Sequence, residues 1–158
     1  HPFVLVPRRL VPKNGVSITI KAMKFLQNKN CTLVIAGDGP EKSKLLKLCK
    51  TQELTERVVF LEALPREKLL PLMAQAQVLV IPSLPIHGVI EATSLSVLEA
   101  MSLGKVVIAS RIGGLNEIIS HVENGFLFDA GDEKMLAELL SKILSDRDLQ
   151  ELIGQKAL

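Results

Sequence analysis

Six short apolar runs, rich in β-branched residues, recur along the chain, and segments with helical periodicity lie between and after them. The first five runs carry almost no polar residues, which is typical of strands that are covered on both faces in a parallel sheet. Strict alternation of strand and helix predicts an α/β fold: a Rossmann-like, doubly wound parallel sheet of about six strands with helices on both faces. The predicted strands are residues 3–7, 32–36, 57–61, 78–81, 106–110 and 125–128.

The segments between and after these strands have apolar residues at three- and four-residue spacing, which predicts helices. With 158 residues and 47% hydrophobic side chains, the chain can bury a sizeable core, and we expect residues 1–158 to form a single domain. Four phenylalanines belong to that core by their pattern: Phe25, Phe60, Phe126 and Phe128. The predicted helices are residues 15–26, 41–52, 66–75, 94–104, 115–120, 133–145 and 148–157.

The overall charge argues against a nucleic-acid-binding surface. The 19 basic and 17 acidic residues give a net charge of +2 without a dense basic run, and the chain has no Trp or Tyr to stack on bases. Cys31 and Cys49 lie outside the spacing of metal sites and disulfide frameworks, so we expect a reducing, cytoplasmic compartment. The chain begins at His1 without a methionine and enters a strand at once, which suggests a piece of a longer protein.

Open α/β sheets bind ligands beyond the carboxyl ends of their strands, so the turns that follow the strands are the expected site. The turn after the first strand contains Arg8, Arg9 and Lys13, and we interpret these cations as a clamp for a diphosphate. Glycines in two further turns let the backbone approach a ligand closely, although ordinary turn chemistry explains the first pair equally well. The pairs are Gly37 and Gly39 after the second strand, and Gly113 and Gly114 after the fifth.

The sequence contains neither a GxGxxG dinucleotide fingerprint nor a P-loop, and it lacks a cluster of Asp, Glu and His with metal-ligand spacing. We therefore predict no metal and no cofactor. If a diphosphate binds, Arg9, Lys13 and helix N-termini must neutralise its charge instead.

The segment EATSLSVLEAM carries two carboxylates with a helix start between them. A carboxylate suits vicinal hydroxyls because its two oxygens accept from both O–H groups, whereas a phosphate prefers the backbone N–H groups of a helix N-terminus. A nucleotide sugar has diols at both ends and phosphates in the middle. The segment offers matching groups in that order: Glu91, the N–H groups of Thr93, Ser94 and Leu95, and Glu99. From spacing alone, a loop glutamate and a solvated helix glutamate are an equally good interpretation.

Taken together and in this order, the motifs resemble those of the C-terminal, donor-binding domain of glycosyltransferase family 4, whose members are retaining enzymes of the GT-B fold. The similarity covers essentially the whole chain. The matching stretches are Arg9 and Leu10 with Lys13 and Gly15, residues 33–40 (LVIAGDGP), residues 78–83 (VLVIPS), the E-x7-E signature of residues 91–101 with LEAM intact, residues 104–110 with Gly113 and Gly114, residues 117–119 and residues 124–127 (NGFL).

The resemblance implies a nucleoside-diphosphate sugar as the substrate. By that resemblance Glu99 holds the ribose hydroxyls, and Glu91 contacts the hydroxyls of the donor sugar. Arg9 and Lys13 would clamp the diphosphate. The residues implied for the base follow the third strand: Glu62, Ala63 and Leu64.

Two positions depart from the family pattern. The family usually has Gly-Phe-Gly after the first glutamate, where this chain has Ala-Thr-Ser, so that hydroxyls can replace bare backbone as contacts to phosphate or sugar. The family lysine directly precedes the glycine of the first turn, whereas here Asn14 precedes Gly15. Lys13, or Arg8 in its place, is then the cation expected to reach the phosphates.

The resemblance implies the donor domain of an enzyme that transfers a glycosyl group to a hydroxyl acceptor with retention, and Arg9, Lys13 and Glu91 are its candidate catalytic residues. The acceptor would bind mainly to an N-terminal domain that this chain lacks, and the full-length protein could associate peripherally with a membrane. We expect weak donor binding and little transfer from this chain alone. Two alternatives stay open, a GT-B nucleotide-sugar epimerase and a non-catalytic nucleotide-binding module.

Overall fold

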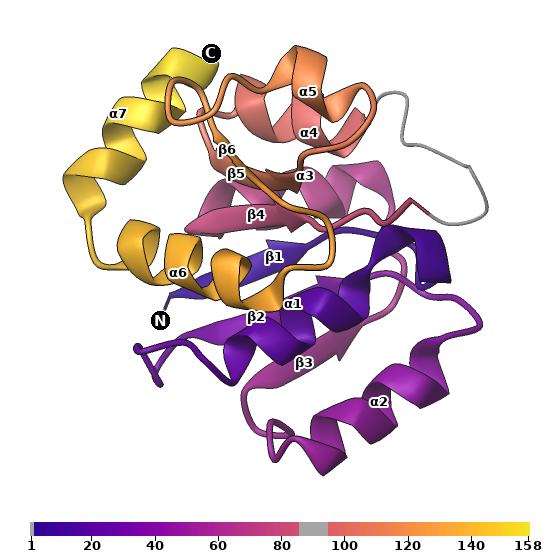
Figure 1. Cartoon of the computed structure of the whole chain (residues 1–158). Coiled ribbons are helices and arrows are strands. Elements are labelled where there is room, and N and C mark those ends of the chain that lie inside the picture. The colour runs from indigo at the N-terminus through magenta and orange to yellow at the C-terminus, as the bar shows by residue number, and fades with distance from the viewer. Residues whose placement is uncertain (1, 86–94) are drawn as a thin grey trace.

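Figure 1 shows a computed structural model of the chain, which describes residues 2–85 and 95–158. Its centre is a sheet in which all paired strands are parallel. The strands are β1 (Phe3–Val6), β2 (Thr32–Ala36), β3 (Val58–Leu61), β4 (Val78–Ile81), β5 (Val106–Ser110) and β6 (Phe126–Phe128). Their order across the sheet is β3-β2-β1-β4-β5-β6, so the strand order reverses between β1 and β4. This topology confirms the predicted doubly wound parallel sheet.

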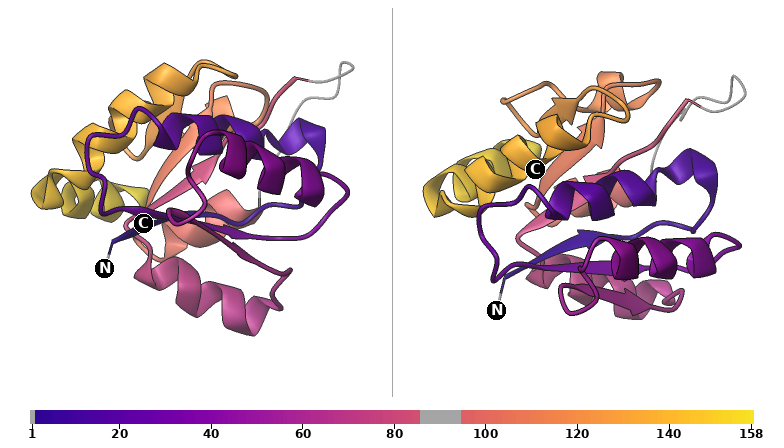
Figure 2. Two further views of the ribbon diagram at one scale, coloured as in Figure 1. Left: turned by 90° about the horizontal axis from the view of Figure 1, so that it is seen from below. Right: turned by 60° about the horizontal axis from the view of Figure 1, so that its bottom comes forward.

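Helices cover both faces of this sheet. They are the 3-10 helix η1 (Pro12–Asn14) and the α-helices α1 (Val16–Met23), α2 (Lys42–Thr51), α3 (Arg66–Gln75), α4 (Leu95–Ser102), α5 (Leu115–Ile118), α6 (Glu133–Leu144) and α7 (Arg147–Ala157). Buried residues of α1, α2 and α6 form a core on one face, and those of α3, α4 and α5 form a second core on the other. In the left view of Figure 2, α1 and α2 lie above the sheet and α3 lies below it.

The alternation of side chains along β1 explains why the sheet is covered on both sides. Val4 and Val6 lie in the core beneath α1, α2 and α6, whereas Leu5 between them lies in the second core. All three side chains are fully buried. Leu5 pairs in register with Val34 on one side and with Leu79 on the other. A strand in this position has no polar face, which is why its sequence reads as an unbroken apolar run.

One residue that the sequence pattern assigned to the core lies on the surface. Helix α1 ends at Met23, three residues before its predicted end, and Phe25 follows it with 44% of its surface exposed. The Lys134 ammonium of α6 lies 5.7 Å from the centre of this ring, in a cation–π contact. The expectation for Phe25 was therefore wrong, because apolar spacing does not say where a helix ends. The other three phenylalanines of that prediction are buried wholly or in part.

Candidate functional site

A cavity of about 230 Å³ opens at the carboxyl edge of the sheet, where β1, β2 and β3 end side by side. This is the edge at which doubly wound folds bind ligands. Four residues that the sequence predicts for the site meet in its lining: Arg9, Gly37, Ala63 and Leu64. The other lining residues are Pro7, Arg8, Ala36, Asp38 and Leu69.

The two arginines after β1 differ in their surroundings. The Arg8 guanidinium donates through Nη2 to the Oδ1 of Asn14, and the Nδ2 of Asn14 donates to the Arg9 carbonyl at 2.7 Å. Asn14 is 4% exposed, so this amide holds the turn together from inside. Arg8 is thereby partly buried and positioned, whereas Arg9 is exposed at the cavity. Asn14, at the family's lysine position, serves the shape of the turn.

The backbone of Lys13 contacts the loop that follows β4. Its side chain is exposed on η1, and its carbonyl accepts the N–H of Leu84 at 2.8 Å. The next residue, Gly15, has φ 61°, and a Cβ there would lie 1.9 Å from the Pro82 carbonyl oxygen. Only glycine fits this left-handed position against the backbone of the other loop. The turn after β1, which carries Lys13, and the loop after β4 therefore pack directly against each other.

The glycines after β2 have a packing role that the sequence does not reveal. A Cβ on Gly37 would lie 1.9 Å from the Arg8 carbonyl oxygen, and one on Gly39 would lie 2.5 Å from the Leu10 carbonyl oxygen. The Leu10 N–H also donates to the Asp38 carbonyl at 2.9 Å. Both glycines thus allow the turns after β1 and β2 to touch. Gly37 lines the cavity as well, whereas Gly39 does not.

Asp38 is a cavity residue that the sequence analysis missed. Its Oδ1 accepts the N–H of Gly39 at 2.8 Å, and the side chain is exposed. Its position between two candidate glycines was the available signal. A carboxylate at this point is a hydrogen-bond acceptor for a hydroxyl or an amino group of a ligand.

Glu99 pairs with Arg66, a residue that the sequence analysis did not single out. The Nη1 of Arg66 lies 3.4 Å from the Oε1 of Glu99, in a charged hydrogen bond between α3 and α4. Arg66 comes two residues after Leu64, which lines the cavity. The Glu99 side chain is 12% exposed, whereas Leu95 and Leu98 on the same helix are exposed. The Glu99 carboxylate is thus shielded and paired with a cation, whereas two leucines of the same helix face solvent.

The remaining predicted residues flank this cavity or fall outside the described chain. Glu62 is exposed directly after β3, and Leu95 is the exposed first residue of α4. Gly113, with φ 53°, and Gly114 form the turn between β5 and α5. Glu91, Thr93 and Ser94 lie outside the described residues. Among residues 2–85 and 95–158, no three His, Cys, Asp or Glu side chains gather as metal ligands.

The family model for glycosyl transferases group 1 matches residues 1–158, the whole chain. The chain belongs to this family. As a glycosyl transferase of group 1, it carries the C-terminal domain of a GT-B fold, as the motifs of its turns predicted.

Two curated relatives of this glycosyl transferase domain are much longer than the chain. An uncharacterized glycosyltransferase of Methanocaldococcus jannaschii is 36% identical over 155 residues, which cover 98% of the chain and 38% of the relative. The N-acetyl-alpha-D-glucosaminyl L-malate synthase of Bacillus anthracis is 31% identical over 134 residues, which cover 85% of the chain and 33% of the relative. The chain therefore spans 38% and 33% of the length of these two relatives.

A solved relative carries a ligand. The crystal structure of Anabaena HepE in complex with UDP-glucose has a TM-score of 0.88 and 27% identity to this glycosyl transferase domain. The match covers 98% of the chain and 42% of HepE.

Proposed function

We propose that this chain binds a nucleoside-diphosphate sugar and that, within a longer protein, it serves the transfer of the glycosyl group to a hydroxyl acceptor with retention. One observation carries the proposal: the shielded carboxylate of Glu99 pairs with Arg66, which begins α3 two residues after Leu64 of the cavity that also contains Arg9. The site thus offers a cation for phosphate, an apolar wall for a base and an acceptor for ribose hydroxyls within one edge of the sheet. The similarity to HepE, whose crystal structure holds UDP-glucose, supports this interpretation.

The nucleoside is assigned to the wall formed by the end of β3. Leu64 and Leu69 supply apolar surface to the cavity, and Ala63 lies beside them. A base stacks on such a wall while its ribose reaches toward α4. There the Glu99 carboxylate accepts from the 2′ and 3′ hydroxyls, and Arg66 holds the carboxylate in place. A volume of about 230 Å³ suits one part of a sugar nucleotide, so the diphosphate and sugar extend beyond it.

The diphosphate is assigned to the cations after β1. When the bond between the anomeric carbon and the β-phosphate oxygen breaks, the nucleoside diphosphate leaves with additional negative charge. Arg9 and Lys13, both exposed, can donate to those oxygens, and a fixed donor at a developing charge lowers the barrier. The Arg8 guanidinium is held in place by its hydrogen bond to Asn14, whereas the Arg9 and Lys13 side chains are exposed. The acceptor hydroxyl supplies the oxygen of the new bond, and its proton passes to the β-phosphate oxygen of the departing nucleoside diphosphate.

Several parts of the proposal rest on the sequence motifs alone. Glu91 remains the candidate for the hydroxyls of the donor sugar, with Thr93 and Ser94 at the phosphates. Gly113 and Gly114 remain candidates for backbone contacts to the donor.

The acceptor is proposed to bind mainly to an N-terminal domain of the full-length protein. Peripheral association of that protein with a cytoplasmic membrane face is part of the same proposal. In the part of the chain that the structure describes, no helix has the length and apolarity to cross a membrane.

The test is a titration of the 15N-labelled chain with a panel of nucleoside diphosphates and sugar nucleotides. We expect one nucleotide to bind and to shift the amide signals of residues 8, 9, 36–38, 63, 64 and 66. Binding that shifts other regions, or no binding across the panel, overturns the proposal. A full-length protein that converts the donor to an epimer without glycosylating an acceptor would favour the epimerase, and tight binding without any turnover would favour the non-catalytic module.

A further inference from the structure

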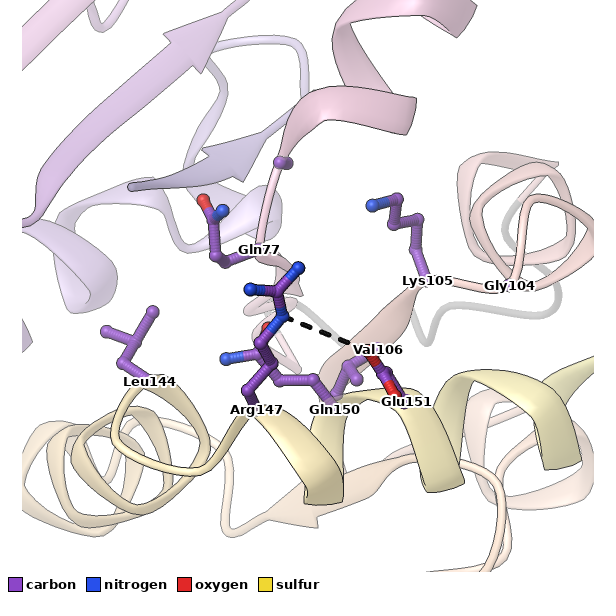
Figure 3. Close-up of a pocket in the computed structure, with 9 residues that line it drawn as sticks. Gln77, Gly104, Lys105, Val106, Leu144, Arg147, Gln150 and Glu151 are labelled. Carbon is purple, nitrogen blue, oxygen red and sulfur yellow. Dashed lines mark ion pairs between the residues drawn. The ribbon is translucent and has the colours of Figure 1, made fainter. Parts of the chain in front are cut away.

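A second cavity lies at the opposite edge of the sheet, at the amino ends of β4 and β5. Its volume is about 480 Å³, against about 230 Å³ for the cavity at the carboxyl edge. Figure 3 shows side chains from three distant parts of the chain around it. Gln77 precedes β4, Lys105 precedes β5, and Arg147, Gln150 and Glu151 belong to α7. Ala76, Gly104, Val106 and Leu144 complete the lining.

A glycine contact fixes the distance between the two main walls of this cavity. Gly104 has φ 70° and ends the turn after α4, and Gly154 lies on α7. A Cβ on Gly154 would lie 2.1 Å from the Gly104 carbonyl oxygen, so the helix and the turn touch backbone to backbone. The N–H of Lys105 donates to the Ala100 carbonyl at 3.0 Å, which fixes the start of β5. The cavity walls are therefore held by backbone packing, not only by surface side chains.

Three hydrogen-bond donors from three parts of the chain line the cavity (Figure 3): Lys105, the Gln77 amide and Arg147. Lys105 is partly buried, and burial lowers the pKa of its ammonium. Within residues 2–85 and 95–158, no carboxylate forms an ion pair with it. The Oε1 of Gln77 accepts the N–H of Phe3 at 2.8 Å, so its amide nitrogen is the group left to donate. The Arg147 guanidinium points into the same space as the Lys105 ammonium (Figure 3).

Helix α7 also supplies two hydrogen-bond acceptors to the cavity, from Gln150 and Glu151. The Nε2 of Gln150 donates to the Ile143 carbonyl at 2.8 Å, which leaves its Oε1 as an acceptor. The Glu151 carboxylate lies 3.8 Å from the Nε of Arg147, and both side chains are exposed. An ion pair of this kind contributes little and is easily exchanged for a ligand contact. Two cations and one carboxylate leave the lining with a net positive charge.

We propose that this cavity is a second ligand site, which takes a small phosphorylated polyol such as a sugar phosphate. The phosphate lies between Lys105 and Arg147 with the Gln77 amide as a further donor. The polyol hydroxyls donate to the Gln150 amide oxygen and to Glu151. A dianion between the two cations compensates the charge of Lys105, which burial leaves poorly solvated. The volume is that of a pocket for a small molecule.

The test is an NMR titration of the chain with ribose 5-phosphate, and in parallel with inorganic phosphate and with ribose. We expect the sugar phosphate to bind and to shift the amide signals of residues 76–77, 104–106 and 147–151. Lys105→Met keeps the aliphatic stem and removes the charge, and Arg147→Gln changes an exposed side chain without threatening the fold. Each variant should weaken binding about tenfold. Lys47→Met, on the exposed side of α2, is the matched control and should leave binding unchanged.

Each arm decides one part of the proposal. No binding of ribose 5-phosphate, or unchanged binding by both variants, overturns the site. Shifts confined to residues 8, 9 and 36–38 show that the anion binds only at the carboxyl edge, which also overturns the site. Ribose that binds as tightly as ribose 5-phosphate contradicts the anion contact, and inorganic phosphate that binds as tightly contradicts the polyol contacts. None of these outcomes depends on nucleotide binding at the other edge.

Discussion

Arg66 on α3 and Glu99 on α4 form a charged hydrogen bond in which the carboxylate is shielded and the guanidinium is not. The side chain of Glu99 is 12% exposed, and that of Arg66 is 64% exposed. Their nitrogen and oxygen atoms are 3.4 Å apart. A pair with one exposed partner contributes little to stability, so its value lies in orienting the carboxylate. Arg66 lies two residues after Leu64, which lines the cavity at the carboxyl edge, so we expect the pair to orient Glu99 toward that cavity.

Arg66→Gln is expected to weaken nucleoside-diphosphate binding roughly threefold to tenfold while the stability of the fold changes little. The reason is that the Glu99 carboxylate loses its fixed orientation but keeps its charge. In the Glu99→Gln background the same substitution should have almost no further effect, because the two residues act as one unit. Calorimetric titration of the four proteins measures this coupling.

The control for that cycle is Lys68→Gln, an exposed cation on the same helix. It should leave the affinity of both backgrounds unchanged. Additive losses from Arg66→Gln and Glu99→Gln would contradict the positioning role of Arg66.

Gly15→Ala is expected to destabilise the chain by about 2 kcal/mol more than Gly131→Ala does. Both glycines have positive φ, 61° and 84°, so both substitutions carry backbone strain. A Cβ on Gly15 would also meet the Pro82 carbonyl oxygen at 1.9 Å, whereas one on Gly131 would lie 3.8 Å from the nearest atom, in Leu84. Urea denaturation of the two variants measures the difference. Equal losses of unfolding free energy in the two variants would show that the turn after β1 and the loop after β4 can move apart to accommodate a Cβ, and would contradict the prediction.

The free energy of unfolding is expected to fall as the pH rises above about 9, because of the two thiols. Burial raises the pKa of both Cys31 and Cys49 to about 11 from an ordinary 9.0. The unfolded chain therefore loses these protons at lower pH than the folded chain, so their contribution is complete below pH 9.0 and is lost toward pH 11. The two thiols together account for a loss of about 4 kcal/mol between roughly pH 9 and pH 11.

The control for the pH prediction is the double variant Cys31→Ala and Cys49→Ala. We expect its unfolding free energy, measured by denaturant titration across the same pH range, to fall less than that of the unmodified chain, and the difference should equal the loss assigned to the two thiols. Parallel curves for the two proteins would contradict the assignment to the thiols.

The fold could be predicted because burial on both faces leaves a strong trace in the sequence. The unbroken apolar runs at β4 and β5 reflect strands whose residues are all buried. The end of α1 could not be predicted, because Phe25 has the spacing of a core residue while its contacts are with solvent and Lys134. Helix ends depend on local capping and tertiary contacts that apolar spacing does not record.

The site could be predicted in part. Arg9, Gly37, Ala63 and Leu64 converge in one cavity because the carboxyl ends of parallel strands meet at one edge. Arg66 escaped prediction because its partner lies on another helix, 33 residues further along the chain. The burial of Asn14 could not be predicted either, because the sequence of a turn does not show which side chain points inward.

The binding of paired ribonucleotides and deoxyribonucleotides to the chain and to its Glu99→Gln variant tests whether Glu99 holds the ribose of the nucleotide. If Glu99 holds the ribose, the chain binds the nucleoside diphosphate about tenfold more tightly than its 2′-deoxy form. Glu99→Gln should weaken the binding of the ribose form and largely abolish that preference. Glu67→Gln, an exposed carboxylate on α3, should keep the preference intact. A variant at Glu99 that still discriminates the two sugars as strongly as the unmodified chain would contradict the account.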